Sequence, residues 1–209
     1  MKFDKTLIIT SVICLLPAAF GAAVYGSLPE MVPSHWNFNG EIDGYTPKAI
    51  AAFGLPIMMF ALNFITHFVL NNDPKRKNAG KMAVVLGKFT VPVLSLLMVP
   101  MSLLNGLGVE MPVHYIAPFF VGAVFIISGN YMPKCKQNYT VGIKIPWTLN
   151  SEENWNKTHR LAGKVWIVGG FVIALCPFLN GAKYTFFAVM MVLLFVPYIY
   201  SYYLYRKGI

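Results

Sequence analysis

The most constraining feature of this sequence is the spacing of its charged residues, which leaves six long uncharged windows. The windows contain 18 to 23 residues each and cover residues 6–27, 49–70, 89–109, 111–133, 165–182 and 184–205. About 20 apolar residues cross the hydrocarbon core of a bilayer as a helix, and a charge at the centre of such a helix costs about 2.5–3.5 kcal/mol on insertion scales. The windows therefore predict an all-α, polytopic membrane protein, a bundle of six transmembrane helices.

The composition supports the same fold class. Charged residues make up 12% and hydrophobic residues 56% of the 209 residues, whereas a soluble domain carries about 25% charged residues. The three cysteines are too few and too scattered to indicate a disulfide framework. We expect a single membrane domain over residues 1–209.

The first window has an alternative interpretation as a cleaved signal peptide, because Met1–Lys5 is short and basic. Its apolar run is longer than the usual core of a signal peptide, about 7–15 residues. The small residues of Ala18–Ala23 provide only an ambiguous cleavage site. We therefore expect an uncleaved first helix.

The basic residues predict how the helices are oriented. If the N-terminus is cytoplasmic, 15 of the 17 lysines and arginines lie on the inner side and only Lys48 and Lys183 lie outside. Such a positive-inside bias predicts that both termini lie inside. The net charge of +9 is then explained by topology and by contact with the anionic inner leaflet of the lipid bilayer, so that no direct binding of nucleic acid is expected.

The first candidate binding segment is the outer-loop motif LPEMVPSHWNFNGEIDGYTPK, residues 28–48. Its prolines and glycines favour turns rather than helix. Thr46 followed by Pro47 resembles an N-cap with proline at the first helical position, which would start the second helix. The aromatic and polar candidates of this segment are His35, Trp36, Phe38, Glu41, Asp43 and Tyr45.

These side chains allow more than one role. The aromatic residues could form a belt at the lipid headgroups. His35 and the carboxylates, with Glu110 and His114 of the next outer loop, could bind a metal. Because no spacing matches a known ligand motif, we expect neither a metal site nor a cofactor. We expect His67 and His114, near the ends of their helices, to anchor those helices at the membrane interfaces.

The two loops expected between spans on the cytoplasmic side differ in length and character. NNDPKRKNAGK, residues 71–81, is short, flexible-looking and basic, and contact with anionic lipid explains it adequately. The cytoplasmic loop motif, residues 134–164, is longer and more structured. Gly142 and Pro146 there delimit a short extended piece that brings Trp147 forward.

The second half of this motif carries helix signals. Asn150 resembles an N-cap, and Glu153 three residues later can close a capping box. We predict a helix from about residue 151 that continues into the fifth span, and we expect proline to be tolerated at Asn154 in the first turn. One face of this helix would carry Trp155, His159, Ala162 and Trp166.

His159 is the candidate general base of this motif. A general base needs a nucleophile or a bound water within reach of the imidazole, and the sequence contains none of the common catalytic motifs such as HExxH or GxSxG. We therefore expect no catalytic residues and no enzyme. The tryptophans of the motif fit interface anchoring and recognition equally well.

These motifs resemble a known family. The outer-loop motif, followed by GIKIPWTL and then by WNKTHRLAG, is similar to the bacterial SdpI-type family of integral membrane proteins, named for immunity to the sporulation-delaying protein. The resemblance covers both motifs and the six-helix layout, which is nearly the whole chain. One departure is Ile145, which stands where a threonine is expected before the proline.

The resemblance implies a multi-pass protein of the bacterial cytoplasmic membrane that gives resistance to a secreted, membrane-active peptide toxin. It also implies that some members transduce signals by recruiting a cytoplasmic transcriptional repressor. On this interpretation the six outer-loop candidates bind the toxin. Eight inner residues would bind the cytoplasmic partner, namely Lys144, Pro146, Trp147, Thr148, Trp155, Thr158, His159 and Arg160.

Two other classes of function remain open. A small transporter or permease is favoured only by the prolines and glycines within the spans. No carboxylate, lysine or arginine lies at the centre of a span, where transporters usually keep their ion-coupling groups. A membrane-embedded enzyme that uses His159 ranks third.

Overall fold

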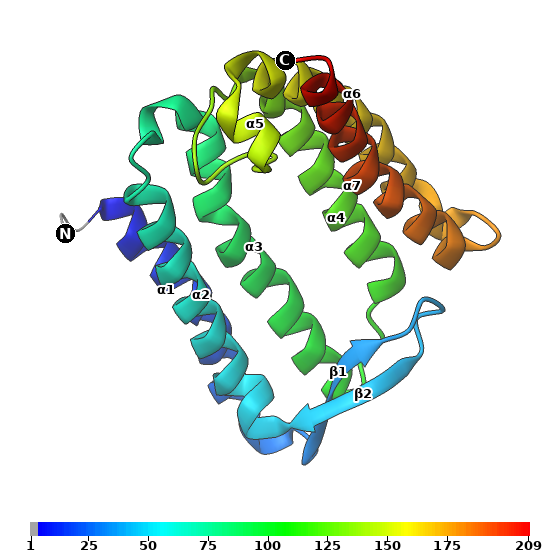
Figure 1. The fold of residues 1–209 in the computed structure, drawn as a ribbon. Coiled ribbons are helices and arrows are strands. Elements are labelled where there is room, and N and C mark those ends of the chain that lie inside the picture. The colour runs from blue at the N-terminus through cyan, green and yellow to red at the C-terminus, as the bar shows by residue number, and fades with distance from the viewer. Residues whose placement is uncertain (1–3) are drawn as a thin grey trace. The chain divides into compact units, whose positions relative to one another are not determined.

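The computed structural model describes residues 4–209, so Lys2, which contributes to the predicted orientation, lies outside the described residues. Six helices in this range are long and apolar enough to cross a membrane (Figure 1). Each of them covers most of one uncharged window, which confirms the predicted six-helix membrane fold.

The chain divides into two compact units, and each is described by itself. The first unit contains Val85–His114 and the chain up to Asn71, and the second contains Asn72–Val84 and Tyr115–Ile209. The long helix α3 (Lys81–Gly106) begins in the second unit and continues through the first.

Two helices of the first unit, α1 (Lys5–Val24) and α2 (Leu55–Asn71), run side by side (Figure 1). A π-helical segment, Ile50–Gly54, precedes α2. Gly21 of α1 faces this segment so closely that an added Cβ would lie 2.9 Å from the Ala52 Cβ. Small residues therefore permit the close contact of these helices.

A two-stranded antiparallel hairpin connects α1 to this segment. Its strands are β1 (Met31–Trp36) and β2 (Ile42–Pro47), where the sequence predicted turns only. The helix start predicted at Thr46 is also wrong, because Thr46 and Pro47 both pair with β1. Pro47 ends the ladder opposite Met31, a position where a missing N–H is tolerated.

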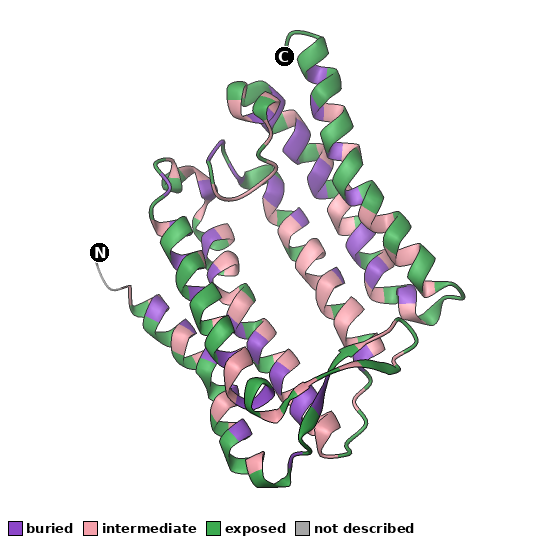
Figure 2. Ribbon diagram, turned by 60° about the horizontal axis from the view of Figure 1, so that its bottom comes forward, coloured by how far each residue is buried: buried purple, intermediate pink, exposed green. Residues whose placement is uncertain are grey.

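Strand β1 attaches the hairpin to the helices of the first unit. Val32 is fully buried in an apolar cluster at this end of the helices, and the Ser102 hydroxyl of α3 donates to the Pro33 carbonyl. The remaining members of the buried cluster are Leu28, Ala51, Ala52, Val99 and Leu103. Much of the hairpin beyond this attachment is exposed (Figure 2).

Polar side chains form a second buried region of the first unit. His67 is only 1% exposed, so it is not the interface anchor that the sequence suggested. Its Nε2 lies 3.0 Å from the Thr10 hydroxyl, to which Asn63 also donates at 3.1 Å. Lys88 of α3 pairs with Asp4, and this bond lowers the pKa of the Asp4 carboxyl to about 2.

The second unit is built from α4 (Val113–Tyr131), α6 (Glu152–Leu175) and α7 (Ala182–Arg206). Two glycine pairs bring α4 and α6 into backbone contact. A Cβ on Gly129 would lie 2.8 Å from the Gly163 carbonyl oxygen, and Gly122 faces Gly170 in the same way. The seven-residue spacing on both helices keeps the glycines on one face, which explains why the backbones approach so closely.

A short helix, α5 (Pro146–Asn150), lies at one end of this unit beside the C-terminus (Figure 1). After it, α6 runs from Glu152 to Leu175 without interruption, which confirms the predicted continuity with the fifth span. The cap is Ser151 rather than Asn150, because Asn150 still belongs to α5. The Ser151 hydroxyl accepts the Asn154 N–H at 3.2 Å.

Candidate functional site

The tip of the hairpin is an ordered turn. The side-chain oxygen of Asn37 accepts the backbone N–H groups of Asn39 at 2.9 Å and Glu41 at 3.0 Å. Gly40 has a φ of +85°, a conformation that glycine adopts without strain. The ring of His114 lies against Gly40. The tip is therefore held in one shape by its own side chains.

An irregular register sets the side chains of the hairpin. The regular pairing of the strands is broken on both sides of His35, which lies opposite Gly44. A Cβ at Gly44 would lie 2.8 Å from the His35 Cβ, so glycine is needed there. The imidazole of His35 contacts the Asp43 carboxylate at 2.5 Å, and both side chains are largely exposed.

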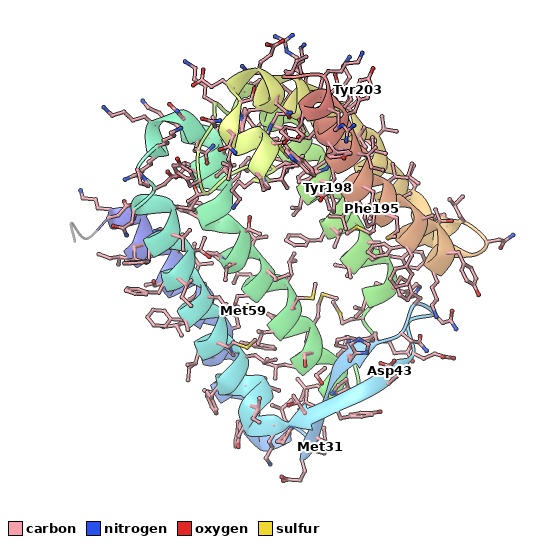
Figure 3. The ribbon with its side chains drawn as sticks, viewed as in Figure 1. Met31, Asp43, Met59, Phe195, Tyr198 and Tyr203 are labelled. Atoms are coloured by element: carbon pink, nitrogen blue, oxygen red, sulfur yellow. The ribbon has the colours of Figure 1, made fainter. Side chains whose placement is uncertain are left out.

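The exposed part of the hairpin combines aromatic and acidic groups. Tyr45 is 56% and Phe38 40% exposed, and Trp36 is half-buried. Figure 3 labels Asp43 on this hairpin and Met31 at its opposite end. At the base of the hairpin, Lys48 donates to Glu30 at 2.8 Å, and this bond raises the pKa of the Lys48 ammonium.

The cytoplasmic loop motif is organised around Trp155, which is completely buried. Its ring stacks on His159 with a centroid distance of 3.9 Å, and its Nε1 donates to the Cys135 carbonyl at 2.8 Å. Gly142, with a φ of +113°, passes so close that a Cβ would lie 3.1 Å from the Trp155 ring. The turn at Gly142 therefore depends on having no side chain.

The hydrogen bonds of His159 define its tautomer. Nε2 accepts the backbone N–H of Ile143 at 3.0 Å, and Nδ1 lies 2.8 Å from the Trp155 carbonyl. Because a carbonyl can only accept, Nδ1 carries the proton and the ring is neutral. Both nitrogens are thereby engaged with backbone groups, an arrangement that suits a structural role rather than proton transfer.

Ile145 stands where a threonine is expected, and the hydroxyl of Thr148 makes the hydrogen bonds near this position instead. Its Oγ1 accepts the Ile145 N–H at 3.2 Å and lies 2.7 Å from the Ile143 carbonyl. The bend before α5 is therefore stabilised from within the helix. Thr148 is fully buried and cannot be reached from outside in this structure.

The basic segment 71–81 is ordered against the same loop, which corrects its flexible appearance in the sequence. Lys75 donates to the Gln137 side-chain oxygen at 2.8 Å, and Asn78 donates to the Gln137 carbonyl at 2.8 Å. The Gln137 amide in turn donates to the Thr148 and Leu149 carbonyls of α5 at 2.9 and 2.8 Å. Gln137 thus connects two loop segments that are distant in sequence.

Asp73 is the second connection. Its carboxylate accepts the Thr140 hydroxyl at 2.7 Å and the Tyr139 N–H at 3.0 Å. Burial raises the pKa of Asp73, but these bonds and that from the Lys75 N–H outweigh it, so the net pKa is lowered. The carboxylate therefore stays ionised where it joins the two segments.

The sequence did not single out Asp73, Gln137, Asn138 and Thr140. Asn138 accepts the N–H groups of Thr140 and Val141 at 3.0 and 2.7 Å, and asparagine favours turns because its side chain can bond the backbone two residues on. The local turn was therefore visible in the sequence, whereas the pairing between segments was not.

Trp147 and Asn154 join this motif to α7. Trp147 packs against Tyr198 with a centroid distance of 5.1 Å and against Tyr202 at 5.0 Å. Asn154 is buried, donates to the Ser201 carbonyl at 3.0 Å and accepts the Ser201 hydroxyl at 2.6 Å. These bonds contradict the expectation that proline would be tolerated at Asn154.

The sequence-based candidates of the inner motif thus fall into two groups. Four of them are at most 1% exposed: Thr148, Trp155, Thr158 and His159. Lys144, Pro146 and Arg160 are exposed, and Trp147 is half-buried. The structure brings all six outer-loop candidates together on the hairpin. Within residues 4–209 no cluster of three or more metal-ligating side chains occurs, and the three cysteines are free and buried.

The fold and the two ordered segments define the class of protein. It is a multi-pass cell-membrane protein with six apolar helices, an exposed hairpin after the first helix, and a hydrogen-bonded loop motif that leads into the fifth.

Comparison with known proteins gives the family. Residues 134–201 match the SdpI/YfhL protein family, and residues 12–60 match a domain of unknown function, DUF1648. The chain is 31% identical over 205 residues to the protein "Immunity protein SdpI" of Bacillus subtilis (strain 168), covering 97% of each chain. The chain therefore belongs to the SdpI/YfhL family. No solved structure matches it.

Proposed function

We propose that this chain is a membrane immunity protein that gives resistance to a secreted, membrane-active peptide toxin. The observation that carries the proposal is the 31% identity to the immunity protein of B. subtilis over 97% of both chains. A match over nearly the full length includes both the hairpin and the inner motif, so it does not rest on membrane-spanning composition alone.

The hairpin is the proposed surface that meets the toxin. Exposed aromatic rings, such as those of Phe38 and Tyr45, suit contact with a hydrophobic peptide. The outer-loop motif contains three carboxylates, Glu30, Glu41 and Asp43, but only one ammonium group, that of Lys48. This excess of negative charge favours a basic peptide and would speed its arrival. His35 and Trp36 complete the proposed surface.

Survival under toxin challenge tests this proposal. Sensitive cells that express the chain would be exposed to purified sporulation-delaying protein and to other membrane-active peptides, and depolarisation would be followed with a voltage-sensitive dye. We expect expressing cells to keep their membrane potential. Cells that lose it against every peptide, despite normal abundance of the chain in the membrane, would refute the immunity function.

The proposed mechanism is binding rather than catalysis. Interception of a toxin requires no chemical step, and the imidazole of His159 has both nitrogens engaged with backbone groups. Purified chain should therefore leave the mass of the toxin unchanged. A cleaved or modified toxin after incubation would favour the enzymatic alternative.

A second role in signalling is proposed for the inner motif. Lys144, Pro146, Trp147 and Arg160 are the accessible members of the eight candidates, and the buried four would maintain the shape of that surface. A photo-crosslinking residue at Lys144, used in cells with and without toxin, would test whether a cytoplasmic repressor is recruited. Failure to capture any DNA-binding protein under either condition would argue against this role.

Both roles assume that the hairpin faces outward and the inner motif faces the cytoplasm. Native Cys135 is a poor reporter because its thiol is buried, which raises its pKa. Exposed positions are better, so we propose Asn39→Cys on the hairpin and Asn150→Cys at the end of α5. An impermeant thiol reagent should label only the first in intact cells, and only the second in sealed inside-out vesicles.

A further inference from the structure

A groove with basic walls opens on the second unit and is partly lined by residues of the cytoplasmic loop motif. It has a volume of about 610 Å³, which lies within the range of about 300–1,000 Å³ typical of small-molecule sites. Lys157, Arg160 and Lys164 of α6 line it. We propose that this groove binds the headgroup of one anionic phospholipid.

The backbone of α4 and α6 creates the groove. Gly129 and Gly163 lie among its lining residues and also bring the two helices into direct backbone contact. A Cβ on Gly163 would lie 2.8 Å from the Pro133 ring. Because neither glycine has a side chain, the two backbones meet there, and the longer lining side chains surround this contact.

The charge of the groove is poorly compensated by the protein. Glu153 pairs with Lys157 at 2.7 Å, and it is the only carboxylate in residues 4–209 that forms an ion pair with a groove cation. Arg160 and Lys164 are exposed. The groove therefore keeps a net positive charge of two, which one or two phosphate groups would neutralise. Tyr200 adds a hydroxyl donor to the lining.

The order of residues along α6 distinguishes a lipid from a soluble anion. Lys157, Arg160 and Lys164 share one side of the helix, because their spacing of three and four residues returns to the same face. Ile167 follows on that side and also lines the groove. Lys164 is the last charged residue before the uncharged window of residues 165–182. The groove thus changes from cationic to apolar in the direction in which a bilayer changes from headgroup to acyl chain.

A cytoplasmic acidic peptide fits this gradient less well. Such a peptide would satisfy the cations but would place polar backbone next to Ile167 and Gly129, at the level of the apolar windows. Unpaired peptide groups are costly in hydrocarbon. A phospholipid matches both ends of the groove with one molecule. This inference does not depend on the immunity function.

Native mass spectrometry of the full chain in detergent tests the proposal. The chain would be incubated with phosphatidylglycerol or with phosphatidylcholine of the same acyl chains, and retained lipid would be counted. We expect one tightly held phosphatidylglycerol and no comparable phosphatidylcholine. Each cation near a headgroup contributes about a fivefold gain in binding, so Arg160→Gln with Lys164→Gln should weaken retention by about 25-fold.

The matched control is Arg76→Gln with Lys77→Gln. These two cations are also exposed and belong to the same unit, but they do not line the groove. The control should retain the lipid, and we expect phosphatidylglycerol to raise its melting temperature as much as that of the unaltered chain. Equal losses in both double variants would show diffuse charge attraction and overturn the site. A groove variant that keeps the lipid but no longer recruits a cytoplasmic protein would assign the groove to that protein instead.

Discussion

The hairpin and the cytoplasmic loop motif are both polar, aromatic-rich segments, yet they use their side chains in opposite ways. On the hairpin, Tyr45 and Phe38 project outward, and the His35–Asp43 pair is largely exposed. In the inner motif, Trp155 and His159 are buried and bound to backbone groups. An aromatic residue in a loop is therefore no guide to recognition by itself. The outer segment is suited to direct contact, whereas most of the inner segment supports a few exposed residues.

The largest expected effect on the free energy of unfolding is found by comparing alanine variants of two tryptophans, one in each segment. Trp155→Ala should lower the free energy of unfolding by about 3–5 kcal/mol, because it leaves a large cavity and removes the donor to the Cys135 carbonyl. Trp36→Ala, at a half-buried position of the hairpin, should lower it by about 1 kcal/mol. SDS-induced unfolding in mixed micelles measures both. Similar losses for the two variants would remove the contrast between the segments.

The second prediction compares two glycines of the same unit. Gly142 and Gly80 both have positive φ values, +113° and +79°, but only Gly142 has neighbours that an added Cβ would meet. Gly80→Ala should lower the free energy of unfolding by about 1 kcal/mol through backbone strain alone. Gly142→Ala should lower it by about 3 kcal/mol, because its Cβ would also displace His159 and Trp155. The same unfolding assay compares them, and equal values would show that the Gly142 turn adapts freely.

The third prediction concerns acid. Asp73 has a folded-state pKa below its usual 3.8, so the stability it contributes is complete above about pH 4 and is lost as the pH falls through the folded pKa. Asp73→Asn should therefore lower stability by about 1 kcal/mol at pH 7 and flatten its decline below about pH 4. Melting temperatures across this range provide the measurement.

Thr140→Val is the partner variant for this test. It removes one of the hydrogen bonds that lower the pKa of Asp73 and keeps the carboxylate itself. Its acid profile should lie between those of the unaltered chain and Asp73→Asn. An unchanged profile in both variants would mean that Asp73 does not govern the acid stability of the inner segments.

The contrast between segments also shows what the sequence could predict. Charge spacing predicted the six spans, and the helix signals around residue 151 predicted the start of α6 to within one residue. Both depend on local periodicity and local capping. Buried Asn154 is hydrogen-bonded to Ser201, 47 positions away in the sequence, and no local sequence pattern indicates such a partner.

The hairpin was missed for a different physical reason. Its prolines and glycines are poor strand formers by propensity, yet an irregular register accommodates them, with Gly44 opposite His35 and Pro47 at the end of the ladder. Tertiary contacts of Val32 and Ser102 then hold the strands in place. The residues proposed for toxin contact could thus be named from sequence, but their shared surface could not.

The smallest change in stability should accompany a large change in function. Tyr45 and Tyr139 are about equally exposed, at 56% and 51%, and lie on the hairpin and the inner loop respectively. Replacing either with alanine should alter the free energy of unfolding by no more than about 0.5 kcal/mol, as is usual for exposed positions. Only Tyr45→Ala should weaken protection against the toxin, by about 30-fold in the concentration tolerated if the ring is a dominant contact. Survival and membrane abundance would be measured for both variants in the same cells. Tyr139 lies in the inner segment, next to Lys75, so a toxin that meets only the hairpin would not contact it. Loss of protection in Tyr139→Ala at normal abundance would therefore show that the two surfaces do not act separately.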